Sequence, residues 1–379
     1  MSAWPSVSAE LVDEELLRMS REIPGFGGMF IDNAGSLTVY MQDTSRAPEV
    51  RMRLDLQALG RRIRVVPGQY NFEELYRWRS ELNDVMAEPG VVFTDIDERR
   101  NRVVIGIDEK ADPSTFALLD SLRAATSAPR EAVIVERVAP FHNLQTLRQS
   151  FRPIPNGVQI AFDNFLCTLG YNAIRQGVQG FVTNSHCSTV QGQMNSTVYF
   201  QPLPGTPAIG VEAVDPPFLA GGQCPPGRLC RFSDTLFARY NSPALAQNWM
   251  VARPTALGSI TVNPAAPRWT VAAVGGVAAG AVVNKVGRTT GWSQGAVIAS
   301  CVNVNAAGTT FTLLCQNVVN AAVGGGDSGS PVFTLQQNPS ITHVGILWGG
   351  NAAGTQLVYS PFANVIQPTE LGPIQVSVP

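Results

Sequence analysis

The spacing of apolar residues changes its period about 140 residues into the chain. In the first part, some segments repeat apolar residues at three- and four-residue intervals, which predicts helices. Others alternate apolar and polar residues, which predicts strands. We expect helices over residues 9–21, 72–87 and 113–125, hairpins over residues 28–41 and 91–108, and a strand over residues 132–136. This order of elements predicts a small α+β domain, an open sheet with helices on one face.

From about residue 155 onward, helical spacing almost disappears and short apolar runs broken by Gly, Asn and Pro replace it. The clearest runs are residues 180–183, 197–200, 235–240, 310–314 and 343–348. Regularly spaced short strands are typical of barrels and sandwiches, and the length of this part suits two small barrels. The second part is therefore predicted to be all-β.

Composition changes where the periodicity changes. Residues 1–140 are rich in Glu, Asp, Arg and Leu and contain no cysteine, whereas the β-rich part is poor in charge and holds all six cysteines. A length of 379 residues also favours more than one domain. We expect a first domain over 1–140, a linker over 141–156 and a second domain over 157–379.

Charge and hydropathy argue against several classes of protein. The net charge is −2 and no Lys/Arg-rich run occurs, so we expect no nucleic-acid partner. No stretch approaches the roughly 18 apolar residues of a membrane span. Residues 1–5 lack the charged and apolar regions of a secretory signal.

The cysteines indicate an oxidising destination, secreted or periplasmic, because an even number of them is confined to one part of the chain. Many connectivities are possible for six cysteines, but local closure favours short-range pairs. A structural zinc site is the alternative, yet the chain has three histidines and no C-x-x-C motif, so we expect no metal. The favoured pairs are Cys167–Cys187, Cys224–Cys230 and Cys301–Cys315.

The stretch Gly324–Pro331, Gly-Gly-Gly-Asp-Ser-Gly-Ser-Pro, has the composition of a nucleophile loop. A serine hydroxyl such as that of Ser328 needs a base to take its proton and donors to hold the oxyanion that forms. Glycines suit the donor role because they let backbone N–H groups turn inward together. The alternative is a surface turn, since Gly, Asp and Ser are also the usual turn residues.

Three histidines are available as the base. His142 lies between the two parts and His343 opens an apolar strand, whereas His186 ends an apolar strand just before a cysteine. Asp234 starts another apolar strand, where a carboxylate is unfavourable unless it is paired. It is the candidate for the group that orients the imidazole. Taken singly, His186 and Asp234 would each also fit an ordinary turn.

Together these residues resemble the chymotrypsin-like serine proteases. The family's Thr-Ala-Ala-His-Cys block is matched by Thr183–Cys187, and its Gly-Asp-Ser-Gly-Gly-Pro block by Gly326–Pro331. The order histidine, aspartate, serine is also that of the family and differs from the order in α/β-hydrolases. Residues 345–350 resemble the strand that flanks the substrate, and residues 286–291 resemble the bacterial α-lytic protease branch.

The resemblance covers residues 155–379 and implies a chymotrypsin-like double six-stranded β-barrel with serine endopeptidase activity and no cofactor. Ser328 would be the nucleophile, His186 the general base and Asp234 the residue that fixes the histidine tautomer. The backbone N–H groups of Gly326 and Ser328 would hold the oxyanion. The alternatives are a catalytically silent binding protein on the same fold and an esterase that uses the same triad.

More weakly, residues 95–105 resemble part of the pro-region that bacterial members of this branch carry, which chaperones folding and inhibits the enzyme. The alternative is an unrelated accessory domain. The linker carries Arg148, Arg152 and Pro153, a composition typical of an exposed processing site. The partners implied are protein or peptide substrates and the chain's own pro-region, with a monomer as the expected state.

Two positions depart from the family pattern. Leu347 stands where the family often has a serine that supports the catalytic aspartate, which would leave Asp234 less supported, and Ser330 replaces a glycine, a change that we expect to be tolerated. Asp327 would be buried beside the nucleophile and therefore needs a cation. The α-lytic branch supplies one from its Arg-Thr-Thr-Gly block, so the resemblance implies an Asp327–Arg288 pair that requires no inserted amino terminus.

The same resemblance places the substrate pocket. Its base would be Ala322, six residues before the nucleophile, and its walls would be Leu347, Trp348, Gly349 and the vicinity of Leu357. A Lys or Arg side chain of a substrate needs a carboxylate at the base of such a pocket, and none is free nearby. We therefore expect cleavage after small to medium apolar residues.

Overall fold

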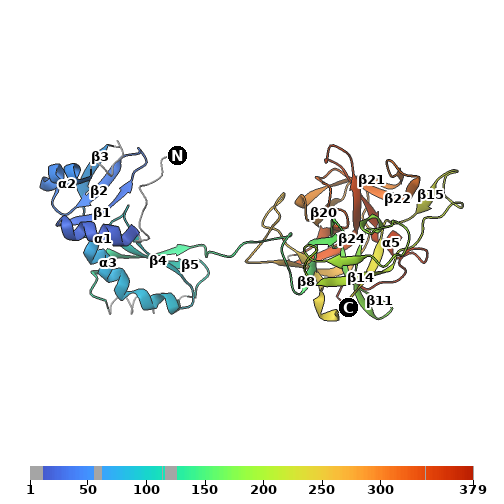
Figure 1. Ribbon diagram of the computed structural model, residues 1–379, viewed down its shortest axis with the longest axis horizontal. Coiled ribbons are helices and arrows are strands. Elements are labelled where there is room, and N and C mark those ends of the chain that lie inside the picture. Colours follow the sequence, from blue (N-terminus) through green and yellow to red (C-terminus); the bar gives the residue numbers. More distant parts are fainter. Residues whose placement is uncertain (1–11, 55–61, 113, 116–125, 338, 379) are drawn as a thin grey trace. The chain divides into compact units, whose positions relative to one another are not determined.

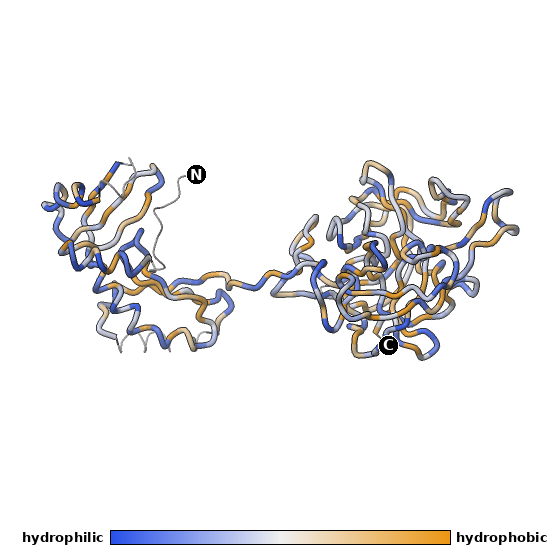
Figure 2. The backbone as a smooth tube through the Cα atoms, viewed as in Figure 1, coloured by the Kyte–Doolittle hydropathy of each residue, from blue (hydrophilic) through white to orange (hydrophobic). Residues whose placement is uncertain are grey.

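The chain divides into two compact units, Met1–His142 and Asn143–Pro379 (Figure 1). The computed structural model describes residues 12–54, 62–112, 114–115, 126–337 and 339–378. Within these residues, no helix is both long and apolar enough to cross a membrane. Apolar and polar stretches alternate along the chain in both units (Figure 2).

The first unit is α+β, with two three-stranded sheets where the sequence predicts one. The sheets have the orders β1-β2-β3 and β4-β5-β6, and each combines one antiparallel and one parallel pairing. The helix expected over 113–125 lies, apart from residues 114–115, outside the described residues. The described elements are α1 (Val12–Glu22), β1 (Phe26–Ile31), β2 (Leu37–Met41), η1 (Thr44–Arg46), α2 (Ala47–Leu54), β3 (Ile63–Pro67), α3 (Phe72–Glu81), η2 (Asn83–Ala87), β4 (Val91–Asp97), β5 (Arg102–Asp108), η3 (Arg130–Ala132) and β6 (Val133–Val138).

Helix α3 begins where the sequence supplies a cap. The Asn71 side chain accepts a hydrogen bond from the Glu74 backbone N–H, and the Glu74 carboxylate accepts one from the Asn71 N–H, which forms a capping box. The helix buries Phe72, Leu75 and Trp78 in the core of the first unit. Burial of each such side chain stabilises the fold by about 1.5–3 kcal/mol.

The second unit is mostly β-strand with few and short helices, as the sequence predicts. Its two large sheets have the orders β10-β9-β13-β14-β16-β12-β11 and β15-β22-β21-β20-β23-β24-β19-β17-β8, with β25 paired to β22 and β24. The elements are β7 (Gln145–Thr146), β8 (Ile154–Asn156), β9 (Gln159–Phe162), β10 (Phe165–Thr168), β11 (Tyr171–Arg175), β12 (Val178–Thr183), η4 (Ser185–Cys187), β13 (Val198–Phe200), β14 (Ala208–Val214), β15 (Leu229–Arg231), β16 (Leu236–Tyr240), η5 (Pro243–Leu245), β17 (Ala246–Ala252), β18 (Thr261–Val262), β19 (Arg268–Val274), β20 (Val282–Gly287), β21 (Gly291–Asn305), β22 (Phe311–Val319), β23 (Pro331–Leu335), β24 (Ser340–Gly350), β25 (Leu357–Pro361) and α5 (Phe362–Val365).

The stretch expected to be a linker, residues 141–156, is largely built into the second unit. Leu147, Phe151 and Ile154 are buried in its core, and β8 pairs in parallel with β17. These apolar side chains can be buried only if the backbone that carries them docks as well. Residues 141–145 form a continuous exposed connection, and Arg148, Arg152 and Pro153 are exposed between the buried side chains. Processing within residues 141–156 therefore stays a prediction.

The three disulfides are those predicted from local closure: Cys167–Cys187, Cys224–Cys230 and Cys301–Cys315. The first joins the end of β10 to η4, the short helix that follows β12. The third closes the hairpin between β21 and β22. The cross-link at η4 lies next to the histidine that the sequence singles out.

Candidate active site

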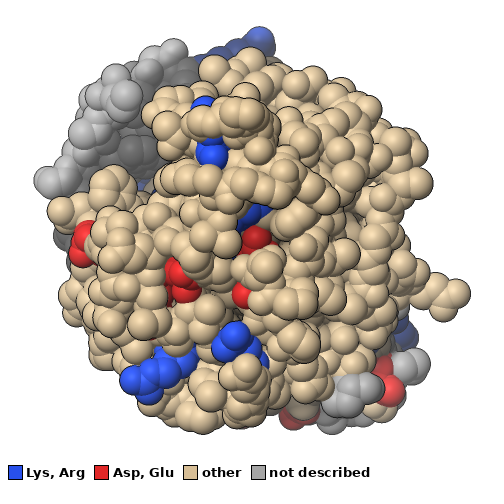
Figure 3. Space-filling model, turned by 90° about the vertical axis from the view of Figure 1, so that its right-hand side faces the viewer, with Lys and Arg blue, Asp and Glu red and all other residues tan. Residues whose placement is uncertain are grey.

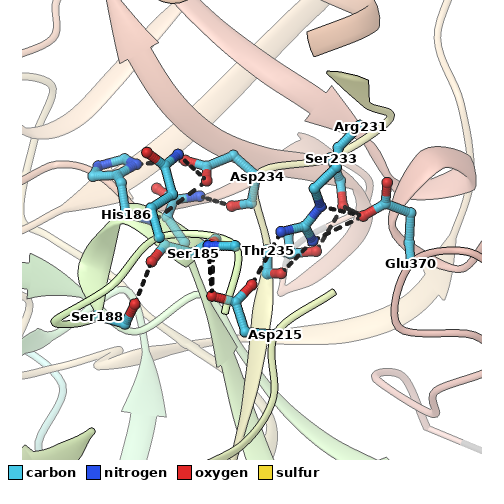
Figure 4. A network of polar contacts seen from close by, with 12 residues as sticks. Ser185, His186, Ser188, Asp215, Arg231, Ser233, Asp234, Thr235 and Glu370 are labelled. Atoms are coloured by element: carbon cyan, nitrogen blue, oxygen red, sulfur yellow. Dashed lines mark hydrogen bonds and ion pairs between the residues drawn. The ribbon is translucent and has the colours of Figure 1, made fainter. Parts of the chain in front are cut away.

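His186 and Asp234 meet because their strands are neighbours. β12 and β16 pair antiparallel with Thr183 opposite Leu236, so the residues just beyond β12 and just before β16 lie side by side. The His186 ring bonds through Nδ1 to Asp234 Oδ2, and the His186 backbone N–H donates to Asp234 Oδ1 at 3.3 Å (Figure 4). The Asp234 side chain is 1% exposed and that of His186 33%. A substrate can therefore reach the imidazole but not the carboxylate.

The two side chains shift each other's pKa. Burial alone lowers the pKa of His186, but the Asp234 carboxylate outweighs burial, so the pKa of His186 is raised above its ordinary value. Burial raises the pKa of Asp234, but His186 and then Arg231 outweigh it, so the pKa of Asp234 is lowered. The carboxylate therefore favours the protonated imidazole, as a residue that orients a general base should.

Gln191 supports Asp234 from a loop that sequence reasoning did not single out. Its Nε2 donates to Asp234 Oδ1 at 3.0 Å. The side chain of Leu347, by contrast, is buried in an apolar cluster with Leu357 and Tyr359. The expectation that Asp234 is left less supported is therefore wrong, because an amide from a different segment provides the donor. No motif in the sequence marks Gln191.

Ser328 lies on the loop between β22 and β23, and backbone contacts fix where this loop docks. The Ser328 carbonyl accepts a hydrogen bond from the Thr168 N–H at 2.8 Å. The Thr168 carbonyl accepts a hydrogen bond from Thr183 Oγ1 at 3.0 Å. Thr183 lies three residues before His186 in the chain. A Cβ on Gly329, whose φ is +89°, would lie 2.1 Å from the Thr168 oxygen, so this close approach requires glycine. The serine loop and the histidine segment thus meet at Thr168.

Several backbone donors on this loop have no acceptor among the described residues, and two of them flank the nucleophile. The N–H groups of Asp327, Gly329 and Ser330 donate to backbone carbonyls. Among the described residues, no acceptor is found for the N–H groups of Gly326 and Ser328, the pair predicted to hold an oxyanion. Donors that flank a serine and are not already bonded can stabilise a negative charge that develops beside it.

Asp327 is paired with Lys285 rather than with Arg288. Lys285 Nζ lies 3.0 Å from Asp327 Oδ2, and both side chains are fully buried. The carboxylate also accepts from the backbone N–H groups of Thr289 and Thr290. Burial raises the pKa of Asp327, but Lys285 outweighs it, so the pKa is lowered.

The geometry of strand β20 explains why Lys285, and not Arg288, pairs with Asp327. Lys285 and Gly287 lie on one face of β20, because side chains alternate along a strand. A Cβ on Gly287 would lie 2.6 Å from an Asp327 oxygen, so this face of β20 is the one packed against Asp327. Arg288 follows in the turn, where its Nε donates to Gln159 Oε1 at 2.6 Å. The predicted Asp327–Arg288 pair is therefore wrong.

The residues predicted to form the substrate pocket differ in exposure. Leu347 and Leu357 are buried in the core, Ala322 is exposed, and Gly349 is half-buried. Trp348 lines a cavity of about 250 Å³ beside the histidine. The cavity is mostly apolar, and its walls include His186, Gln191, Phe218, Phe311, Leu313 and Trp348. Charged side chains are also sparse over the face of the protein shown in Figure 3.

The other two histidines are not placed to act as the base. His142 is exposed in the connection between the units. His343 is fully buried in β24, and this burial lowers its pKa to about 3. Among the described residues, no group of three or more potential metal-ligating side chains occurs.

We predict that Lys285 supports the serine loop and that Arg288 does not. Lys285→Met should lower the free energy of unfolding by about 3–5 kcal/mol, because it leaves Asp327 buried without its cation. Arg288→Met, the matched control, removes side-chain hydrogen bonds to Gln159 and Thr289 in a partly exposed turn and should cost about 1–2 kcal/mol. Urea unfolding of both variants measures the difference, and an equal loss in the two would contradict the assignment.

No family model matches the chain. Among solved structures, it is similar to protease A of Thermobifida fusca, with 22% identity, a TM-score of 0.40, and coverage of 56% of this chain and 94% of that one. It is similar to Nocardiopsis protease, with 20% identity, a TM-score of 0.42, and coverage of 59% and 99%. It is also similar to α-lytic protease homologue N4, with 19% identity, a TM-score of 0.40, and coverage of 56% and 95%. These three solved structures are bacterial chymotrypsin-like serine proteases.

Proposed function

We propose that the protein is a secreted or periplasmic serine endopeptidase with Ser328, His186 and Asp234 as its triad. One arrangement carries the proposal. A half-exposed histidine is bonded through Nδ1 to a buried carboxylate, and its segment meets a serine loop with two unbonded backbone N–H groups. The three disulfides support an oxidising compartment.

The reaction follows from these positions. Ser328 Oγ attacks the scissile carbonyl carbon while His186 Nε2 takes the hydroxyl proton, and the carbonyl oxygen becomes an oxyanion. The N–H groups of Gly326 and Ser328 hold that oxyanion. When the C–N bond breaks, His186 gives the proton to the leaving amine and Ser328 keeps the acyl group. Water, deprotonated by His186, then releases the acid and restores the serine.

The Asp327–Lys285 pair helps to stabilise the oxyanion that forms when the serine attacks. Asp327 lies in sequence between the two residues that donate to the oxyanion, and an unpaired carboxylate there would oppose the negative charge that develops. Lys285 neutralises the Asp327 charge from within the same unit.

Because of this pair, the serine loop can keep its shape without an inserted amino terminus. Inhibition before activation therefore falls to the first unit. We propose that this unit is a pro-region, removed in the exposed connection around residues 141–145.

The substrate side chains bound at this site would be apolar. The cavity beside His186 is walled mainly by apolar side chains, among them Phe218, Phe311, Leu313 and Trp348. The only carboxylate among its walls, Asp234, is already committed to the histidine. A substrate cation placed there would lose its hydration without gaining a partner.

Replacement of the nucleophile tests the proposal. Ser328→Ala should lower kcat for peptide hydrolysis by about 10⁴- to 10⁶-fold, because the members of a triad act as a unit. A fluorophosphonate probe should label the wild-type chain at Ser328 and leave the variant unlabelled. The wild type should also release a fragment that begins near residues 141–145, whereas the variant stays intact.

The outcomes separate the alternatives. A mature form, without the first unit, that the probe does not label would be a binding protein rather than an enzyme. A chain that hydrolyses esters but no peptide would be an esterase. Peptide hydrolysis that persists in carefully purified Ser328→Ala would refute the role of the serine.

The His186–Asp234 pair predicts the pH dependence of activity. The base must be neutral to accept a proton, and Asp234 raises the pKa of His186. Activity should therefore be lost as pH falls through a midpoint above the ordinary histidine value of about 6.5. In Asp234→Asn this midpoint should move to lower pH, since only burial then acts on the ring, and kcat should fall by about 10⁴-fold. The pH profile of kcat/KM measures both effects, and a midpoint unmoved by the substitution would argue against the pairing.

Specificity follows from the absence of a free carboxylate at the site. We predict that cleavage follows small to medium apolar residues such as Ala, Val, Leu or Met. A single methylene in an apolar pocket contributes only about 1–3 kcal/mol, so the preference among them should be broad. A peptide-library profile of the purified enzyme measures this, and a preference for Lys or Arg before the cleaved bond would overturn it.

A further inference from the structure

We propose that Gln191 is a positioning residue for Asp234, held in place by a buried ionic network centred on Arg231. This inference rests on the proposed function, since it concerns the carboxylate that orients the general base. In this proposal, the Gln191 amide and the buried network hold the Asp234 carboxylate in the orientation that the triad needs. No sequence motif marks these residues.

The direct contact is with the carboxylate oxygen that faces away from the bond with the imidazole. Asp234 Oδ2 is bonded to His186 Nδ1, and Oδ1 accepts from Gln191 Nε2 at 3.0 Å. The backbone N–H of His186 also donates to Oδ1, at 3.3 Å. With both oxygens bonded, the carboxylate cannot rotate without losing a hydrogen bond. Because the amide is neutral, it provides this donor without placing a second cation beside the imidazole.

The backbone next to Gln191 is tied to the segment that carries His186. The Gly192 N–H donates to Ser185 Oγ at 2.8 Å and to Asp215 Oδ2 at 3.1 Å. Ser185 Oγ in turn donates to Asp215 Oδ2 at 2.8 Å. Asp215 thus holds Gly192, the residue after Gln191, and Ser185, the residue before His186. Figure 4 shows the contact between Asp215 and Ser185.

Arg231 connects Asp215 to the chain segment that carries Asp234. It lies 3.0 Å from Asp215 and 2.9 Å from Glu370, and all three side chains are at most 2% exposed. The Glu370 carboxylate accepts a hydrogen bond from Ser233 Oγ at 2.8 Å, and Ser233 is the residue immediately before Asp234. The network of Ser185, Asp215, Arg231, Ser233 and Glu370 therefore adjoins all three residues, His186, Gln191 and Asp234.

Stability alone does not account for this arrangement. Desolvation of several charges offsets most of their attraction, so a buried ionic network of this kind gives little net stability. It does fix geometry, because displacement of Arg231 would leave the buried carboxylates of Asp215 and Glu370 without their cation. Gln191 itself is half-buried and lines the cavity beside His186, so its side chain can be changed without opening the core.

The test compares Gln191→Met with Gln193→Met in the full chain. Both replace an amide by an apolar side chain of similar length in the same loop, but Gln193 is exposed. Gln191→Met should lower kcat by about 10- to 100-fold, the usual effect of losing a hydrogen bond to a charged group, with little change in KM. The acid midpoint of kcat/KM should move to higher pH, because the carboxylate loses a donor that shares its charge. Gln193→Met should behave as the wild type.

A merely structural role for Gln191 would not move the pH midpoint. The inference is overturned if Gln191→Met keeps the wild-type kcat, if its loss is confined to KM, or if the midpoint does not rise. Gln191→Glu, which adds a negative charge at the same place, should raise the midpoint further, and no rise would also count against the inference. Fluorophosphonate labelling of the mature wild type, without the first unit, keeps the two hypotheses apart. If this form is not labelled, the proposed function fails, whereas a labelled mature wild type with an unchanged Gln191→Met overturns only this inference.

Discussion

The pairing of β12 with β16 is the contact on which the site depends. His186 and Asp234 are 48 residues apart in the chain, and neither lies within a strand. They meet because the strands that end and begin beside them are hydrogen-bonded neighbours with Thr183 opposite Leu236. A shift of one residue in this register would turn the two side chains to opposite faces, so the apolar pattern that sets the register also sets the chemistry.

The second constraint is the cost of burying charge near the reacting groups. Asp234 and Asp327 are both buried, and each is surrounded by donors of a different kind. Asp234 is bonded to a histidine and to Gln191, which leaves its charge available to the imidazole. Asp327 is paired with Lys285, which cancels its charge beside the unbonded N–H groups of the serine loop. The two environments suit opposite tasks, to stabilise a cation in one case and an anion in the other.

Short stretches of the chain carried much of the prediction. The block ending in His186, the serine loop and the three disulfides each depend on residues close in sequence, so local composition and spacing were enough to find them. The all-β character of the second unit followed in the same way from short apolar runs broken by Gly, Asn and Pro. Capping of α3 by Asn71 and Glu74 is local as well.

Only the tertiary structure decided which distant side chains meet. Lys285 and Arg288 are both about 40 residues from Asp327 in sequence, but the alternation of side chains along β20 points Lys285 to the carboxylate and leaves Arg288 in the turn. The support of Asp234 by Gln191 has a similar reason, because loop docking decides which side chain reaches the carboxylate. The sequence by itself determined the chemical groups and the strands that present them. Packing determined their partners, since the direction of a side chain depends on strand register and on which surfaces bury one another.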